Sequence, residues 1–260
     1  MTEGKPEPAS RSATHGEPGG AASGACRSGV LAFGDSITNG GGELQWGVAL
    51  QSWAQWVARG LGMPFTSYAV DGNRAVDVVS TQIPAFLARN ARADSHYDVG
   101  CLYIGVNDVR AVDWDPSAFD LEFRRAMGFL LRRCDRVLTA TAPLDLGRPR
   151  AGAKVEEMNR LVEAAASGAG ALVVDLRYFA ARNLIMADHV HPTAFGQIAI
   201  AERALAVLER DGMTVQVRPG ELIEYEVTSW RRLRSDLTYA YRHAKVSARA
   251  GALGLLARLR

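Results

Sequence analysis

The sequence has few cysteines, little net charge and no long apolar run. Its three cysteines are far apart and odd in number, which predicts free thiols in a reducing compartment rather than a disulfide scaffold. A formal charge of +2 argues against nucleic acid as a partner of the whole molecule. No run reaches the roughly 18 apolar residues that a membrane span needs. With 48% hydrophobic and 22% charged residues, the composition is that of an ordinary globular protein.

Residues 1–28 lack the apolar core of about 7 residues that a secretory signal needs. The segment is rich in proline, glycine, serine and alanine instead. We expect a disordered N-terminal tail and a cytoplasmic protein.

From residue 29 to about residue 210, short β-rich runs alternate with stretches of helical spacing. This alternation predicts an α/β fold in which helices cover both faces of a parallel sheet. The expected strands are residues 29–34, 65–70, 98–105, 136–143 and 171–176. The expected helices are residues 52–61, 75–90 with a break at Pro84, a helix opened by Asp115 and Pro116, 154–166 and 193–210.

Polar clusters follow four of these five strands. They are Gly34-Asp35-Ser36, Asp71-Gly72-Asn73-Arg74, Gly105-Val106-Asn107-Asp108 and Asp188-His189-Val190-His191-Pro192. Functional loops gather at the carboxyl ends of the strands in an open parallel sheet. The clusters are therefore expected to share one rim.

Four motifs in this order, GDSITNG, the glycine of AVDGNR, GVND and DHVHP, resemble the SGNH (GDSL) hydrolases. The resemblance spans residues 29–210 and implies an esterase or lipase on a flavodoxin-like three-layer αβα sandwich with a five-stranded parallel sheet. It implies Ser36 as nucleophile and His191 and Asp188 as the rest of a triad. It also implies an oxyanion hole of Ser36, Gly72 and Asn107.

The same residues make chemical sense without the family. A serine hydroxyl is a weak nucleophile at neutral pH and needs a base, and histidine, with a pKa near 6.5, suits that role. Asp188 lies three residues before His191, so one turn of chain brings its carboxylate to the imidazole. No metal or organic cofactor is expected.

Each residue also has a structural alternative. Ser36 could be a helix N-cap, Gly72 a turn glycine and Asn107 a loop cap. His189 and His191 beside Asp188 could be metal ligands, although no further ligand cluster is evident in the sequence.

Four charged neighbours of the motifs are candidate substrate-binding residues. Arg74 and Arg110 follow Gly72 and Asn107 closely and could pair with an anionic substrate group, or could be ordinary surface arginines. Asp35 and Asp108 could contact substrate, or could shape their loops by bonding to backbone N–H groups.

Residues 211–260 extend beyond the hydrolase-like domain. Two alternating runs within residues 214–228, around Pro219-Gly220, predict a β-hairpin, and a basic amphipathic helix is expected from residue 229. Residues 229–260 hold eight arginines and lysines against one acid, Asp236. Such a helix docks on the domain with a solvated basic face, or makes peripheral contact with an anionic membrane.

The leading hypothesis is hydrolysis of a small-molecule or lipid ester through an acyl-Ser36 intermediate. Transfer of the same acyl group to an alcohol or amine is an alternative within enzymes. A catalytically silent protein that binds a membrane or an acidic partner is an alternative of a different class. Both remain open at this level.

Overall fold

The computed structural model describes Met1 and residues 29–89, 95–147, 149–181 and 183–258. The tail predicted for residues 1–28 lies, apart from Met1, outside the described residues. Cys26 lies there too, whereas Cys101 and Cys134 are buried free thiols, as expected.

A five-stranded, all-parallel sheet forms the centre of the domain, with strand order β2-β1-β3-β4-β5. Its strands are β1 (Val30–Gly34), β2 (Phe65–Ser67), β3 (Tyr97–Tyr103), β4 (Cys134–Ala140) and β5 (Leu172–Val174). The predicted strands are confirmed, and β2 and β5 are each three residues shorter than expected. This order is that of flavodoxin-like folds. Such folds place their binding sites at the carboxyl ends of β1 and β3, the switch point where the strand order reverses.

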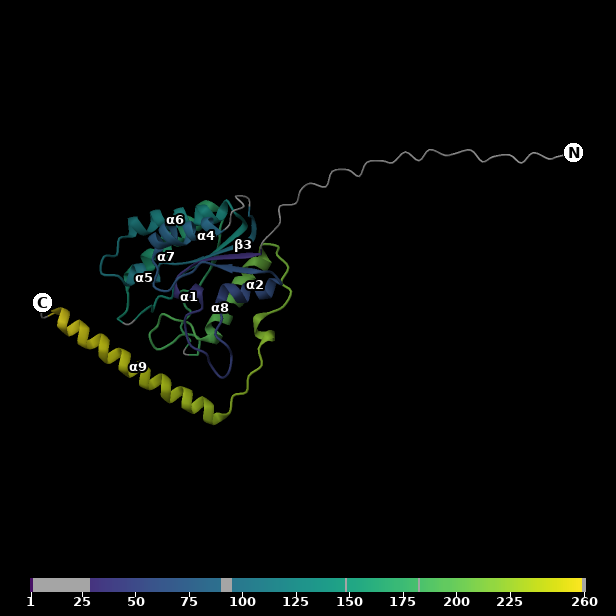
Figure 1. Ribbon diagram of the computed structural model, residues 1–260. Coiled ribbons are helices and arrows are strands. Elements are labelled where there is room, and N and C mark those ends of the chain that lie inside the picture. The colour runs from purple at the N-terminus through teal and green to yellow at the C-terminus, as the bar shows by residue number, and fades with distance from the viewer. Residues whose placement is uncertain (2–28, 90–94, 148, 182, 259–260) are drawn as a thin grey trace.

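Helices cover both faces of the sheet (Figure 1). One face carries α2 (Trp53–Leu61) and α8 (Ala194–Arg210), and the other carries α4 (Ile83–Arg89), α6 (Pro116–Leu131) and α7 (Ala153–Ala169). Caps fix where the helices begin: Ser52, Asp115 and Thr193 accept backbone N–H groups at the starts of α2, α6 and α8. The three-layer αβα sandwich is therefore the observed architecture.

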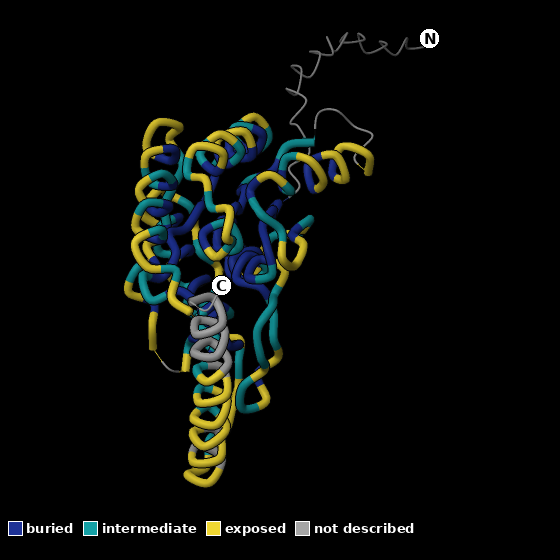
Figure 2. The backbone as a smooth tube through the Cα atoms, turned by 90° about the vertical axis from the view of Figure 1, so that its left-hand side faces the viewer, coloured by how far each residue is buried: buried dark blue, intermediate teal, exposed yellow. Residues whose placement is uncertain are grey.

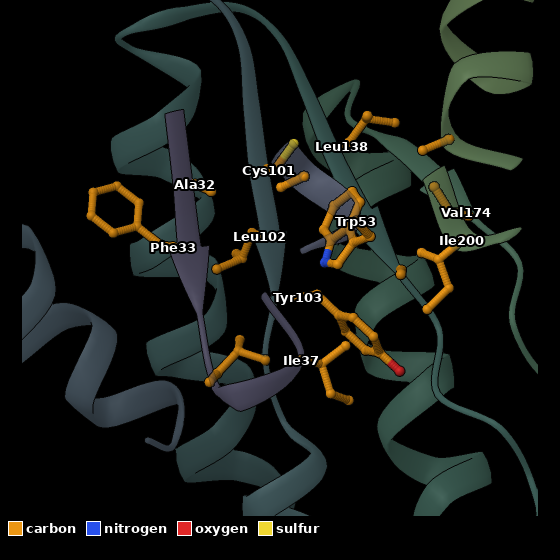
Figure 3. Packing of buried hydrophobic residues seen from close by; sticks show 14 of the residues in the cluster. Ala32, Phe33, Ile37, Trp53, Cys101, Leu102, Tyr103, Leu138, Val174 and Ile200 are labelled. Atoms are coloured by element: carbon orange, nitrogen blue, oxygen red, sulfur yellow. The ribbon is translucent and has the colours of Figure 1, made fainter. Parts of the chain in front are cut away.

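The core lies on both sides of β1 and β3 (Figure 3). Phe33 meets Phe86 of α4 and Phe129 of α6 edge-on, while Tyr103 meets Trp53 of α2 on the opposite face. All are fully or almost fully buried. Burying such aromatic side chains on both faces holds the strand ends, and the loops that follow them, in fixed positions.

The helical stretch around Pro84 does not break as predicted. The chain runs through α3 (Ala75–Asp77), a π-helix η1 (Val78–Gln82) and then α4. The N–H of Ile83 reaches back five residues to the carbonyl of Val78, just before Pro84, which has no N–H to donate. The wider turn accommodates the proline within a continuous helical path.

The β-hairpin predicted for residues 214–228 is wrong. These residues form no strand pair; they run along the domain and include a short 3₁₀ turn, η2 (Pro219–Leu222). Several of their N–H groups bond to the domain: those of Gln216 and Val217 donate to the carbonyl of Gly60 in α2, and that of Gly220 donates to the side chain of Glu202 in α8. The alternation therefore marked a segment packed along two helices.

The C-terminal helix α9 (Ser229–Arg258) begins where it was predicted and lies outside the three layers of the sandwich (Figure 1). Its described turns are mostly exposed, in contrast to the buried centre of the domain (Figure 2). Among the described helices, none is both long and apolar enough to cross a membrane.

Candidate active site

Ser36 sits on a short helix at the carboxyl end of β1. It is the first residue of α1 (Ser36–Asn39), whose N-cap Asp35 accepts the N–H of Ile37 at 3.0 Å. Gly40 ends the helix in a left-handed conformation, with φ of 93°. Caps at both ends of one turn fix the direction of the Ser36 side chain.

Ser36, His191 and Asp188 form a continuous hydrogen-bonded chain. Ser36 Oγ lies 2.9 Å from His191 Nε2, and His191 Nδ1 lies 2.7 Å from Asp188 Oδ2. The other oxygen of Asp188 accepts the backbone N–H groups of Val190 and His191, which folds the loop into one tight turn. The spacing of three residues therefore does bring carboxylate and imidazole together.

The electrostatics of this chain favour a charged Asp188 and a basic His191. The hydrogen bond to Asp188 raises the pKa of His191 above its usual value, and burial only partly opposes this. Burial by itself would raise the pKa of Asp188, but the bonds from His191 and from the N–H of Val190 outweigh it and lower that pKa. The imidazole can therefore take up a proton beside a carboxylate that stays ionised.

Two backbone N–H groups at the site are free to bind a ligand oxygen. Within the described part of the chain, the N–H groups of Ser36 and Gly72 make no hydrogen bond. Gly72 has φ of 78°, which non-glycine residues rarely adopt, and a Cβ there would meet no protein atom within 4 Å. Glycine therefore serves the turn conformation and leaves open space beside it.

Asn107 lies on α5 (Val106–Arg110), a short helix after β3 that the sequence did not predict. Its side-chain Nδ2 donates to the backbone carbonyl of Asn73, one residue after Gly72, at 2.9 Å. An amide nitrogen carries two hydrogens, so one donor remains available. The bond joins the loops after β2 and β3 at the common rim.

Gln82, which sequence reasoning missed, links the end of β1 to the loop after β2. Its side chain accepts the N–H of Gly34 and donates to the carbonyl of Gly34, and its Nε2 also donates to Asn73 Oδ1 at 2.7 Å. The residue is only 2% exposed and lies at the end of the π-helix η1. An amide among the apolar residues Val78, Val79 and Ile83 was the one signal available in the sequence.

Asp35 and Asp108 both make the backbone bonds that the loop-shaping alternative expects. Asp35 is 0% exposed, and burial raises its pKa to about 7. Both oxygens of Asp108 accept the N–H of Ala75 at the start of α3, and burial raises its pKa to about 6. The two carboxyl groups hold the turns after Gly34 and Arg74 in place.

The two candidate arginines differ in their partners. Arg74 Nη1 pairs with Asp113 at 3.1 Å, beside a cavity of about 310 Å³ that Asp108 and Trp114 also line. Arg110 is exposed, and within the described residues it makes no ion pair or hydrogen bond. It lies close enough to His191 to lower the pKa of that imidazole slightly, against the larger effect of Asp188.

His189 does not join His191 at a common point. His189 Nδ1 lies 2.8 Å from Asp145 Oδ2, whereas the His191 ring bonds to Asp188 and Ser36. Over the described ranges, no three His, Cys, Asp or Glu side chains gather as a metal site. His189 also has φ of 57°, so its pairing with Asp145 holds an uncommon backbone conformation next to Asp188.

The family model of the GDSL-like lipase/acylhydrolase family matches residues 32–198, more than half of the chain. The chain belongs to this family. It is thus a GDSL-type carboxylic ester hydrolase, and the motif-bearing residues just described all lie within the matched region.

Solved structures share the fold of this GDSL-like hydrolase. The acetylxylan esterase Axe2 from Geobacillus stearothermophilus has 18% identity and a TM-score of 0.52, with 70% of this chain and 94% of that chain covered. LAE5, an α/β hydrolase from the metagenome of Lake Arreo, has 20% identity and a TM-score of 0.54, with 70% and 95% covered. A search of curated proteins finds no match.

Proposed function

We propose that this GDSL-like hydrolase cleaves carboxylic esters through a covalent acyl-Ser36 intermediate. The observation that carries the proposal is the unbroken hydrogen-bonded chain from Ser36 Oγ through His191 to Asp188. Such a chain is what activates a serine at neutral pH.

In the proposed reaction, His191 Nε2 removes the proton from Ser36 Oγ as that oxygen attacks the ester carbonyl. The carbonyl oxygen becomes an oxyanion, which the N–H groups of Ser36 and Gly72 and the remaining amide hydrogen of Asn107 bind. His191 then gives its proton to the departing alcohol. Asp188 keeps the imidazole in the required tautomer and stabilises its charged form.

Water completes the cycle by attacking the acyl group on Ser36, with His191 again as base. The side chains of His191 and Asp188 are 31% and 32% exposed, so water reaches this end of the site. That exposure favours hydrolysis over transfer of the acyl group to another acceptor, which needs a site that excludes water. The intact hydrogen-bonded chain argues against a catalytically silent protein.

The experiment is a burst measurement with p-nitrophenyl acetate, comparing the protein with its Ser36→Ala variant. We expect turnover and a covalent acetyl group on the protein by mass spectrometry, with both lost in the variant. Product partition in the presence of a simple alcohol separates hydrolysis from acyl transfer. Normal turnover by Ser36→Ala would remove the nucleophile from the proposal.

We further propose that Arg110 binds an anionic group on the substrate, because it is exposed, without a partner in the described chain, and near His191. Arg74 is the matched control, since Asp113 already neutralises it. Arg110→Ala should raise KM about fivefold for a carboxylate-bearing ester and leave the KM of a neutral ester unchanged. Arg74→Ala should change neither KM. Equal effects of Arg110→Ala on both esters would contradict the role.

A further inference from the structure

The helix α9 turns a polar side toward the domain. Arg242 forms an ion pair with Glu43, and the ring of His243 lies 6.1 Å from the ring of His189, the residue after Asp188. Arg234 and Thr238 line a cavity of about 820 Å³ between α9 and the segment that holds Glu43. The contacts of α9 with the hydrolase domain are therefore mainly polar.

Its apolar residues form a stripe on the outside. Trp230, Leu233, Leu237 and Tyr241 are 70%, 48%, 62% and 67% exposed. They follow one another at intervals of three or four residues, and the exposed Ala244 and Ala248 continue the series. At about 100° of rotation per residue, all six fall within an arc of about 80° on one face of the helix.

This arrangement is the reverse of that in α8. There Ile200, Leu205 and Leu208 are almost completely buried against the domain. An apolar face that points away from its own domain gains stability only when something else covers it.

The charges around the stripe indicate what kind of surface covers it. Residues 229–260 contain eight arginines and lysines and one acid. Among the described side chains, Lys245 and Arg234, which is exposed at the rim of the cavity, lie on the same flank of the stripe, about 60° and 40° from Trp230 around the helix axis. Two such helices paired side by side would bring like charges together, whereas an anionic surface complements them.

We propose that α9 binds the surface of an anionic lipid bilayer, with the Trp230–Tyr241 stripe inserted at the interface and the basic flank among the headgroups. A helix of this kind lies in the plane of the interface, consistent with the finding that no described helix suits a transmembrane position. The contact of His243 with His189 then places the Asp188 loop beside the membrane surface.

The experiment is flotation of the full chain with vesicles of phosphatidylcholine alone or with added phosphatidylserine. We expect the protein to float with the mixed vesicles, to float poorly with phosphatidylcholine, and to be released by high salt. Leu233→Glu should weaken binding to mixed vesicles about tenfold or more, because it removes an apolar side chain that the bilayer would bury and adds an acid.

Leu87→Glu is the matched control, since Leu87 lies on α4 with 47% exposure, against 48% for Leu233. It adds the same charge outside the stripe and should leave flotation unchanged. Equal weakening by both variants would reduce the effect to net charge and overturn the proposal. The proposal would also be overturned if the protein does not bind vesicles but sediments as a dimer, and Leu233→Glu dissociates that dimer. A second copy of the chain would then cover the stripe. Hydrolysis of a soluble ester by both variants reports that the domain is folded, independently of lipid.

Discussion

The hydrolase domain and the helix α9 use the same amino-acid types in opposite ways. In the domain, apolar side chains such as Phe33 and Leu205 are buried, and the polar groups of the rim are tied to one another by hydrogen bonds. In α9, polar side chains meet the domain and the apolar ones face outward.

The difference separates two kinds of contribution. The domain holds the candidate catalytic groups and the stability that keeps them in place, because its strands and helices bury a common core on both faces of the sheet. The helix α9 adds neither, and its exposed stripe is available for an interaction. Substitutions in the two regions should therefore change different measured quantities.

The largest effect is expected within the domain, at Asp188. Asp188→Asn should lower kcat about 10⁴-fold, because the amide no longer stabilises a charged imidazole or fixes its tautomer. The hydrogen bond to Asp188 raises the pKa of His191 above 6.5, so wild-type activity should rise with pH through that raised value, as His191 loses its proton. In the variant the rise should move to lower pH, measured as the kcat/KM profile. An unshifted profile would mean that another group titrates.

A leucine-to-alanine pair compares the two regions directly by stability. Leu205 is 0% exposed on α8 and Leu237 is 62% exposed on α9. Leu205→Ala should lower the free energy of unfolding by about 2–5 kcal/mol through a cavity, whereas Leu237→Ala should change it by less than about 0.5 kcal/mol. Urea denaturation measures both. A comparable loss for Leu237→Ala would show that α9 packs against the domain through its stripe.

A third comparison, of two buried amide side chains, should distinguish a residue that positions the candidate site from one that only stabilises the fold. Its expected effects are smaller. Gln82 bonds both the N–H and the carbonyl of Gly34 and also bonds Asn73. Asn159 bonds the N–H and the carbonyl of Ala142, after β4, in the same way. Gln82→Leu and Asn159→Leu should each cost about 1–3 kcal/mol of stability by leaving buried groups unpaired.

Only Gln82→Leu should also lower kcat, by about tenfold, with little change in KM, because Gly34 precedes the turn that holds Ser36. Steady-state kinetics below the denaturation midpoint of both variants gives the comparison. An equal fall in kcat for Asn159→Leu would mean that the loss of activity comes from general destabilisation of the domain and not from the position of Ser36.

The sequence was sufficient to locate the strands, the main helices and the rim on which the motif residues meet. Hydrophobic runs bounded by glycine and polar clusters are local signals, and parallel topology carries those clusters to one edge. The meeting of Ser36 with His191 and of His191 with Asp188 follows from that rule, and the structure has both contacts.

Features that depend on partners far away in the chain could not be predicted from the sequence. The alternation in residues 214–228 looked like a hairpin, but the acceptor for two of its N–H groups is Gly60, far away in the chain. The role of Gln82 depends on its closeness to Gly34, which only the packing of η1 against β1 creates. Which face of α9 meets the domain depends on Glu43 and His189 in the same manner.

Ser36 and His191, the proposed nucleophile and base, lie 155 residues apart in the chain and come from opposite ends of the domain. Bringing them together needs β1, the loop after β5 and the packing of α8 to be complete, so a partly folded chain has no assembled triad. Recovery of ester cleavage during refolding would therefore time the last long-range step of assembly, more selectively than a signal from helix content. The enzyme carries its own reporter of completed folding.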